Sequence, residues 1–331
     1  MKAGIMFAGQ GAQYPGMGKD LYENSNAARE VFDAAGEQVK DWCFNGTKEM
    51  LRQTHITQPS IYTVTMAAYK ALREKLDAHP ELGPAFEIVG YAGFSLGEYS
   101  ALTAAGALTD IAAGQSIVTK RGNWMNEAGM DENGEQRGGM VAGFGRREDI
   151  CAVVEEARGD DILEAVNFNS PVQTVVAGTK PALERFIEVA KEKKVKAKML
   201  SVSTAFHSPL MIPAAKKLKQ LLLESEIRKP DHKIYSNVTG RDMMENYDGG
   251  DIVEYVADLM SRQAMSPVYW QETIENMVKD GVELVIEVGP GKTLSGLAKK
   301  IDKNLKTLHV EDQESLEKTI EELEEIYKEE K

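Results

Sequence analysis

The fold is decided by residues 87–102, EIVGYAGFSLGEYSAL. An apolar, strand-like run leads into the turn Gly-Phe-Ser-Leu-Gly at residues 93–97, and a helix of small residues follows through Ala104. Glycines two places before and two places after Ser95 let the backbone turn tightly and leave the hydroxyl exposed where the helix starts. The helix amides and dipole can then stabilise an oxyanion. The turn predicts a nucleophilic serine; the alternative is a serine N-cap between two glycines.

Around this turn, strand-like and helix-like stretches alternate. Strands are predicted at residues 4–8 and 86–92, and helices at residues 27–39 and 60–76. The pattern resumes after residue 204 and includes the apolar strand 284–288. This alternation predicts an α/β core with a mainly parallel sheet.

The segment 131–203 has a different rhythm. A polar, Gly-rich crossing is followed by elements in the order βαββαβ, which is typical of a small ferredoxin-like unit. The predicted elements are strands 140–144, 162–166, 174–177 and 195–202, helices 148–157 and 181–194, and a turn at residues 169–171. We therefore expect a large subdomain, residues 1–130 and 204–331, with a ferredoxin-like subdomain inserted at residues 131–203.

The composition argues against several classes of function. Lys and Arg total 39 against 52 Asp and Glu, a net charge of −13, so no basic surface for nucleic acid is expected. Cys43 and Cys151 belong to no CxxC pair and lie near no histidine cluster, which argues against a disulfide framework and a metal site. No secretory signal and no run of 18 apolar residues is found. We expect a cytoplasmic protein that binds neither nucleic acid nor a membrane.

Two glycine-rich segments fall short of nucleotide-binding motifs. GQGAQYPGMG at residues 9–18 has Tyr14 where a dinucleotide motif requires its third glycine. VIEVGPGKT at residues 285–293 has Ile286 where a P-loop requires its first glycine. Both remain turns after strands that suit a close approach of the backbone to a ligand, and no nucleotide cofactor is predicted.

A serine nucleophile needs a base, and His207 is the candidate among the five histidines. It follows the stretch KAKMLSVS within TAFHSPL, where a turn is expected at the carboxyl end of a strand, the edge at which α/β sheets place their sites. An ordinary loop histidine is the alternative. Since no acidic residue nearby is an obvious partner, a backbone carbonyl is expected to hold its Nδ1–H.

Arg121 is the third candidate. In the helix that follows Asp110, it shares one stripe with Val118 and Met125 at helical spacing. An unpaired buried cation is costly, so an Arg on this core-facing stripe either pairs with an internal carboxylate or receives the anion of a ligand.

Taken together, the motifs resemble the malonyl-CoA:acyl carrier protein transacylase family of bacterial fatty acid synthesis, which is related to acyltransferase domains of polyketide synthases. They span nearly the whole chain: GQGAQYPGMG, TQPS at 57, GFSLGEYSAL, KRGNWM, NFNSP at 167, TAFHSP, NVTG at 237, RQAMSPVYW and EVGPGKTL. The resemblance implies an α/β-hydrolase-like core with a ferredoxin-like insertion. It also implies transfer of a malonyl group from malonyl-CoA to the thiol of acyl carrier protein through a malonyl-serine ester, without a cofactor.

Carried over residue by residue, the resemblance makes Ser95 the nucleophile, His207 its base and Arg121 the partner of the malonyl carboxylate. The other implied roles are backbone oxyanion donors (Gln10, Leu96), an orienting partner of the histidine (Gln263) and contacts to the substrate (Asn167, Asn169, Phe206). In related polyketide enzymes, a Phe before the histidine accompanies malonyl rather than methylmalonyl, because its ring fills the space that an α-methyl group needs.

Two departures and three alternatives accompany this prediction. Phe94 stands where the family often has His, and Ala8 precedes Gly9 where Pro is frequent. A serine hydrolase of acyl thioesters would share the acyl-enzyme, and a stand-alone acyltransferase of a polyketide pathway would share the chemistry. An inactive carrier-protein docking module is the third alternative. The Lys-rich stretch 191–198 is either a solvated helix end or a surface for an acidic carrier protein.

The tail, SLEKTIEELEEIYKEEK at residues 315–331, has apolar residues at helical spacing with acidic residues between them. We expect a terminal amphipathic helix docked on the core.

Overall fold

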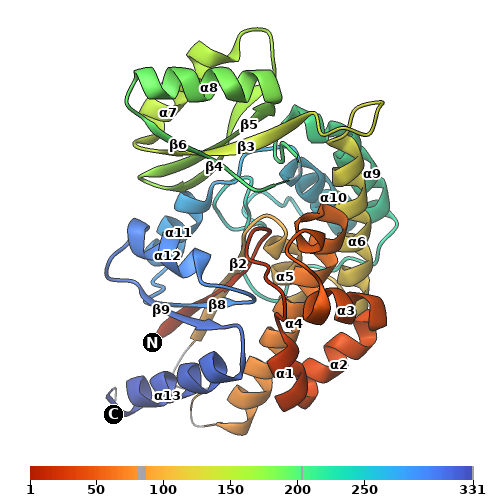
Figure 1. Ribbon diagram of the computed structural model, residues 1–331. Helices are drawn as coiled ribbons and strands as arrows, with labels where there is room; N and C mark the ends of the chain where they lie inside the picture. The colour runs from red at the N-terminus through yellow and green to blue at the C-terminus, as the bar shows by residue number, and fades with distance from the viewer. Residues whose placement is uncertain (81, 83–86, 203, 330–331) are drawn as a thin grey trace.

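The computed structural model describes residues 1–80, 82, 87–202 and 204–329, and these residues form two β-sheets (Figure 1). The larger sheet has five strands in the order β7-β2-β1-β8-β9, and all of its pairs are parallel. Its strands are β1 (Lys2–Phe7), β2 (Glu87–Gly93), β7 (Ile234–Tyr235), β8 (Leu284–Val288) and β9 (Lys306–Val310). The predicted α/β class with a mainly parallel sheet is confirmed. The predicted start of β2, Phe86, lies outside the described residues.

Helices cover both faces of this sheet, because the side chains of a strand alternate between its faces. Ile5 and Phe7 of β1 pack into the main core, which includes the buried side of α4 (Thr54–Ala78), whereas Met6 packs with α11 (Trp270–Lys279) and α12 (Thr293–Ile301) on the other face. The helices outside the second sheet's unit are α1 (Lys19–Asn24), α2 (Asn26–Ala35), α3 (Glu37–Asn45), η1 (Met50–Arg52), α4 (Thr54–Ala78), α5 (Gly97–Ala104), α6 (Ile111–Ala128), η2 (Pro209–Met211), α9 (Ile212–Leu223), α10 (Ile252–Gln263), α11 (Trp270–Lys279), α12 (Thr293–Ile301) and α13 (Gln313–Glu329).

The second sheet is antiparallel, with strand order β4-β5-β3-β6. Its elements are β3 (Gly138–Phe144), α7 (Arg147–Arg158), β4 (Leu163–Ser170), β5 (Gln173–Thr179), α8 (Lys180–Glu192) and β6 (Lys196–Met199), in the predicted order βαββαβ. In Figure 1, α7 and α8 cover the outer face of this sheet. Val141 and Val176 pack under these helices, while Met140, Ala142 and Val175 face the main core. This sheet therefore joins two cores, one on each face.

Three predicted boundaries are wrong. The helix predicted at 27–39 is two helices, because Gly36 takes a left-handed φ of 91° and its N–H bonds to the carbonyl of Phe32, which ends α2. The turn predicted at 169–171 starts later, since β4 continues through Ser170 in its pairing with β5. The strand predicted at 195–202 ends at Met199.

The C-terminal helix α13 lies as expected from its apolar stripe. Leu316, Ile320 and Leu323 are buried in the main core, and α13 contacts β9 and α4. The prediction of an amphipathic helix docked on the core is confirmed for the described residues up to Glu329.

We propose the subdomain boundaries predicted above, 1–130 with 204–331 and 131–203. They are supported by the strands of the two sheets, which fall on opposite sides of these boundaries. Ser203, at one boundary, lies outside the described residues. Among the described helices, none is both long and apolar enough to span a membrane.

Candidate active site

A tight turn between β2 and α5 presents Ser95. A Cβ on Gly93 would lie 1.9 Å from the carbonyl carbon of Gly97, and a Cβ on Gly97 would lie 2.2 Å from the carbonyl oxygen of Phe7. Neither position has room for a side chain. Ser95 itself has a φ of 51°, a left-handed conformation that is strained for a residue other than glycine. The glycine spacing in the sequence therefore has the steric cause that we inferred from it.

Asn237, which follows β7 at the carboxyl edge of the sheet, holds this turn from outside. Its Oδ1 accepts the N–H of Ser95 at 2.7 Å, and its Nδ2 donates to the carbonyl of Gly93 at 2.7 Å. The side chain is fully buried. The motif NVTG does not by itself indicate this role for Asn237; the available signal is its place directly after a strand at this edge.

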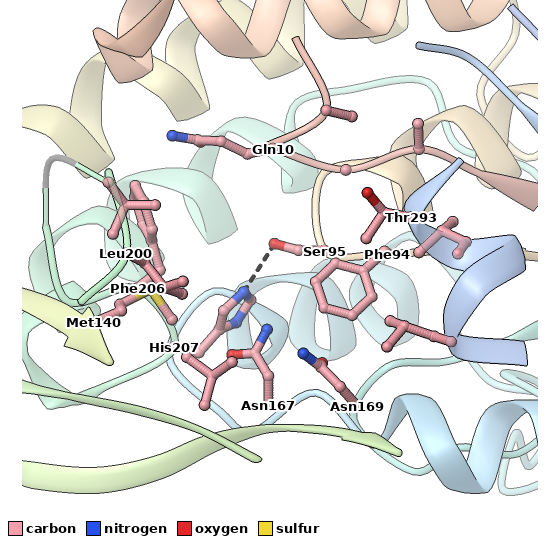
Figure 2. Close-up of a pocket in the computed structure, with 18 of the residues that line it drawn as sticks. Gln10, Phe94, Ser95, Met140, Asn167, Asn169, Leu200, Phe206, His207 and Thr293 are labelled. Carbon is pink, nitrogen blue, oxygen red and sulfur yellow. Dashed lines mark hydrogen bonds between the residues drawn. The ribbon is translucent and has the colours of Figure 1, made fainter. Parts of the chain in front are cut away.

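His207 lies against the serine hydroxyl. Its Nε2 is 2.8 Å from Oγ of Ser95 (Figure 2), and its Nδ1 is 2.9 Å from the carbonyl oxygen of Gln263. The Nδ1–H donates to that carbonyl, which leaves Nε2 free to accept the hydroxyl proton. Burial, and after it the charge of Arg121, lowers the pKa of His207 to about 4. The ring is therefore neutral at pH 7, the form that a general base requires.

The expected position of His207 at the end of a strand is wrong. β6 ends eight residues earlier, at Met199, and belongs to the antiparallel sheet rather than the parallel one. His207 has a φ of 61° and is 3% exposed. The chain that leaves the small sheet thus carries the histidine down to the turn of Ser95.

Arg121 projects from α6 into the same place and is 2% exposed. Its Nη1 donates to Oε1 of Gln58 at 2.8 Å, and its Nη2 lies 3.4 Å from Oγ of Ser95. Its guanidinium also lies over the ring of Tyr99, 5.3 Å from the centroid. In the described part of the chain, Arg121 forms no ion pair with an Asp or Glu. Of the two alternatives for this residue, the geometry favours a cation kept for the anion of a ligand.

Gln263 contacts His207, Arg121 and Ser95, and its sequence motif alone does not predict these contacts. It holds His207 through its backbone carbonyl and not through its side chain. Its Oε1 instead accepts from Nη2 of Arg121 at 3.2 Å, and its Nε2 donates to the carbonyl of Ser95 at 2.7 Å. One residue at the end of α10 therefore contacts the candidate base, the candidate nucleophile and the candidate anion site.

Ser95, His207, Arg121 and Gln58 line a cavity of about 250 Å³. Met140, Leu200 and Phe206 gather on one side of the Ser95 and His207 pair in Figure 2. Asn167 and Asn169 line another side from β4, which is tied to the large subdomain by the bonds of Val268 to residues 166 and 168. Within the described residues, no group of three or more His, Cys, Asp or Glu could hold a metal ion.

Comparison with known proteins agrees with this site. Residues 5–327 match the family described as "Acyl transferase domain". The chain is 39% identical to the malonyl CoA-acyl carrier protein transacylase of Bacillus subtilis, over 98% of each chain, and 35% identical to that of Escherichia coli, over 90% of this chain and 92% of the relative.

Solved structures agree as well. The malonyl CoA-acyl carrier protein transacylase of Clostridium perfringens has a TM-score of 0.87 at 39% identity, over 98% of each chain. A malonyl-transacylase in complex with a type II PKS acyl-carrier protein has a TM-score of 0.87 at 33% identity, over 97% of this chain and all of that one.

The chain belongs to the acyl transferase domain family.

In this acyl transferase, Gln10 and Leu96 are the candidate oxyanion donors. Leu96 follows Ser95 at the start of α5, and Gln10 lines the cavity on the side opposite Asn167 and Asn169 (Figure 2). In the described structure, the backbone N–H of neither Gln10 nor Leu96 donates to another protein group. Backbone N–H groups that have no protein acceptor and lie next to a nucleophile can stabilise a tetrahedral oxyanion.

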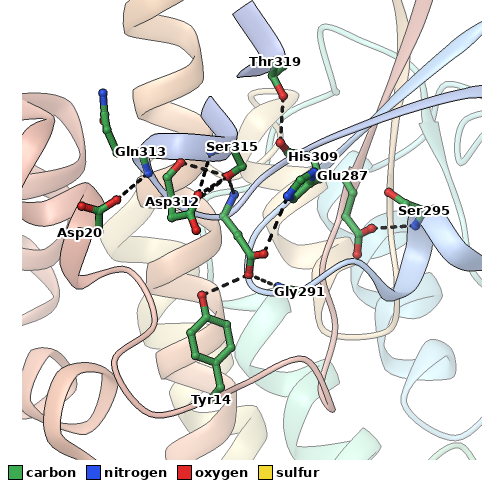
Figure 3. A network of polar contacts seen from close by, with 11 residues as sticks. Tyr14, Asp20, Glu287, Gly291, Ser295, His309, Asp312, Gln313, Ser315 and Thr319 are labelled. Atoms are coloured by element: carbon green, nitrogen blue, oxygen red, sulfur yellow. Dashed lines mark hydrogen bonds and ion pairs between the residues drawn. The ribbon is translucent and has the colours of Figure 1, made fainter. Parts of the chain in front are cut away.

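A polar network around Glu311 holds the loop that contains Gln10 and Tyr14 in place (Figure 3). Oε2 of Glu311 accepts from the hydroxyl of Tyr14 at 3.1 Å and from the N–H of Gly291 at 2.8 Å. It thereby ties the two glycine-rich turns of the sequence to each other. Where that loop meets the serine turn, a Cβ on Gly9 would lie 2.3 Å from the carbonyl oxygen of Phe94, so the approach requires glycine.

The asparagines of β4 have unused polar atoms. Asn167 and Asn169 are 5% and 7% exposed, and the Oδ1 of each is buried without a hydrogen-bond partner in the described structure. Nδ2 of Asn169 donates to Gln173 at 3.1 Å. Buried, unpaired polar atoms on a cavity wall suit contacts to a polar substrate.

Proposed function

We propose that the protein transfers a malonyl group from malonyl-CoA to the phosphopantetheine thiol of acyl carrier protein, through a malonyl ester on Ser95. The relatives named malonyl CoA-acyl carrier protein transacylase support the acyl group and the acceptor. The structure of a relative in complex with an acyl-carrier protein supports that partner. The transfer supplies malonyl thioesters for fatty acid synthesis in the cytoplasm and uses no cofactor.

The first half-reaction forms the ester. Oγ of Ser95 attacks the thioester carbonyl carbon while Nε2 of His207, 2.8 Å away, takes the hydroxyl proton. The N–H groups of Gln10 and Leu96 stabilise the oxyanion. When the carbon–sulfur bond breaks, the imidazolium returns its proton to the thiolate of coenzyme A. The carbonyl of Gln263 holds the ring in the same tautomer throughout.

The second half-reaction is the reverse with another thiol. The pantetheine thiol of the carrier protein gives its proton to His207 and attacks the ester carbon. The oxygen of Ser95 leaves and takes that proton back. Arg121 grips the malonyl carboxylate with two parallel hydrogen bonds in both halves, which fixes the carbonyl over Ser95.

A single observation carries this proposal: a buried Arg121 that forms no ion pair with any of the described residues lies 3.4 Å from the hydroxyl that His207 contacts. The desolvation of a guanidinium is costly, and a substrate carboxylate in that place offsets it. This geometry supports an acyl group with a free carboxylate and not a simple fatty acyl chain.

The test is the mass of the intact protein after mixing with malonyl-CoA. We expect a covalent malonyl adduct that persists in buffer and is removed within seconds by carrier protein. Loss of the adduct to water at the same rate as to carrier protein would support the alternative, a serine hydrolase of acyl thioesters. Absence of any adduct on the wild-type protein would contradict both.

A further inference from the structure

We propose that Glu98 is a positioning residue, whose carboxylate orients the side-chain amide of Gln263 so that its oxygen faces Arg121 and its nitrogen faces the turn of Ser95. The inference rests on the proposed function and adds to it a residue that touches no reacting atom. Glu98 lies in the first turn of α5, three residues after Ser95.

Glu98 is fully buried and joins three segments of the chain. Its two oxygens accept the N–H of Asn237 at 3.2 and 3.3 Å, next to the side chain that holds the serine turn. Its Oε2 accepts from Nε2 of Gln263 at 3.1 Å. A buried carboxylate remains charged only where such donors surround it, so these bonds join α5, the segment after β7 and α10 at one point.

The carboxylate decides which way the Gln263 amide points. An ionised carboxylate only accepts hydrogen bonds, so it selects the nitrogen end of the amide. The same nitrogen donates to the carbonyl of Ser95, and the oxygen end is then left for Arg121. The reversed amide would set its N–H groups against the guanidinium, donor against donor.

Arg121 depends on this orientation because the amide oxygens of two glutamines hold its guanidinium. Oε1 of Gln58 accepts from Nη1, and Oε1 of Gln263 accepts from Nη2. Two neutral oxygens hold the guanidinium without cancelling its charge, which keeps it available to a substrate carboxylate. Glu98 supports this arrangement indirectly, through its hydrogen bond to the amide of Gln263.

Protonation of Glu98 would undo the arrangement. Burial raises the pKa of Glu98 to about 7, while bonds from Gln263, Asn237 and Ser236 and the charge of Arg121 oppose the rise. The titratable groups that face it are Arg121 from α6 and Tyr99 of its own helix. A protonated carboxyl accepts the Nε2–H of Gln263 more weakly, and an O–H directed at the amide of Gln263 favours the turned amide, whose oxygen faces away from Arg121. Malonyl transfer to Ser95 should therefore fall as the pH drops through about 7.

The experiment is single-turnover acylation by malonyl-CoA, measured without carrier protein from pH 5 to pH 9 on the wild type and on Glu98→Gln. Glutamine keeps the shape and one acceptor oxygen but does not titrate. We expect the wild-type rate to decline below about pH 7 and the variant to show no such decline. At pH 8 the variant should be about 5- to 15-fold slower, because a charge-assisted hydrogen bond has become a neutral one.

The controls separate positioning from folding. The ionisations of the substrate are the same in both measurements, so the difference between the two profiles isolates Glu98. Asp258→Asn removes an exposed carboxylate from α10, the helix that carries Gln263, and should keep the wild-type profile. An unchanged decline near pH 7 in Glu98→Gln would overturn the proposal, and a uniform loss of rate with that decline intact would reduce Glu98 to a structural role.

A second variant decides the matter if Glu98→Gln fails to fold. Gln263→Met removes the amide but keeps the backbone carbonyl that holds His207. We expect it to lose the decline near pH 7 and to lower the ratio of malonyl to acetyl acylation. A wild-type ratio and profile in this variant would overturn the proposal even though the proposed function stands, whereas a wild-type protein that forms no malonyl adduct would overturn the function itself.

Discussion

The two sides of the cavity are built on different principles. On one side, Ser95, His207 and Arg121 are joined by hydrogen bonds of 2.8 and 3.4 Å, and each is held by a further polar partner. On the other side, Met140, Leu200 and Phe206 contribute apolar surface. The polar side positions the groups proposed to react, whereas the apolar side determines the shape of the cavity.

The two sides should therefore control different properties: the polar side the rate of acyl transfer, and the apolar side the choice of acyl group. Removal of a hydrogen-bonded group leaves its partners unsatisfied in a site that excludes water. This raises the free energy of the transition state strongly. An apolar side chain that is removed changes only which acyl groups fit. Substitutions on the polar side should therefore have the larger effects.

The largest effect is expected for Ser95→Ala. It deletes one hydroxyl and no core volume, so the malonyl adduct should be lost, with transfer reduced by at least about 10⁴-fold. The thermal midpoint should stay within a few degrees of the wild type. Intact mass and a melting curve measure both. A full malonyl mass shift in this variant would rule out Ser95 as the nucleophile.

His207→Ala removes the proposed base and should slow acylation at neutral pH by roughly 10²- to 10⁴-fold. Because the pKa of His207 is lowered to about 4, the wild-type ring stays neutral down to that pH. The measurement is single-turnover acylation at pH 8. If the rate did not change, the base would have to be another group and the polar side would lose its central member.

Arg121→Ala separates selectivity from rate within the polar side. Loss of one partner of a buried charge pair costs about 2 to 5 kcal/mol, so malonyl transfer should fall by roughly 30-fold to several thousand-fold. Transfer from acetyl-CoA, which has no carboxylate, should fall much less. Arg121→Lys is the matched control, since it keeps the charge without the planar fork. Equal losses for both substrates would make Arg121 a structural residue.

Phe206→Ala tests the apolar side and should have the smallest effect. Phe206 is 7% exposed and lines the cavity one residue before His207. If its ring occupies the space of an α-methyl group, its removal should raise the ratio of methylmalonyl to malonyl transfer by about 5- to 150-fold, as expected from an overpacking cost of about 1 to 3 kcal/mol. Equal use of both substrates by the wild type would refute this explanation.

The control for Phe206 is Phe144→Ala. Phe144 ends β3 and lies outside the cavity lining. Its loss should leave the ratio of the two substrates unchanged. A similar shift in both variants would mean that loosened packing, and not the space beside His207, determines which acyl group is accepted.

Local features of the sequence were enough for the class of the fold and for the serine turn. The glycines at 93 and 97 are required by contacts within a few residues and with the adjacent strand, and strand and helix periods follow from backbone geometry. The order βαββαβ and the docked helix α13 were predicted for the same reason. The break at Gly36 was missed because an apolar stripe continued across it.

Only the tertiary structure decided how the candidate groups meet. His207 reaches Ser95 from 112 residues away, and its partner carbonyl at Gln263 lies 56 residues further along the chain. Neither the lack of an ion pair at Arg121 among the residues that the structure describes nor the burial of Glu98 and Asn237 leaves a periodic trace in the sequence. Periodicity records which face of an element is buried, whereas pairing between distant segments depends on how the sheets and loops close around one cavity. The residue types of the site are therefore readable from the sequence, and their hydrogen-bond partners follow from the closure of the fold.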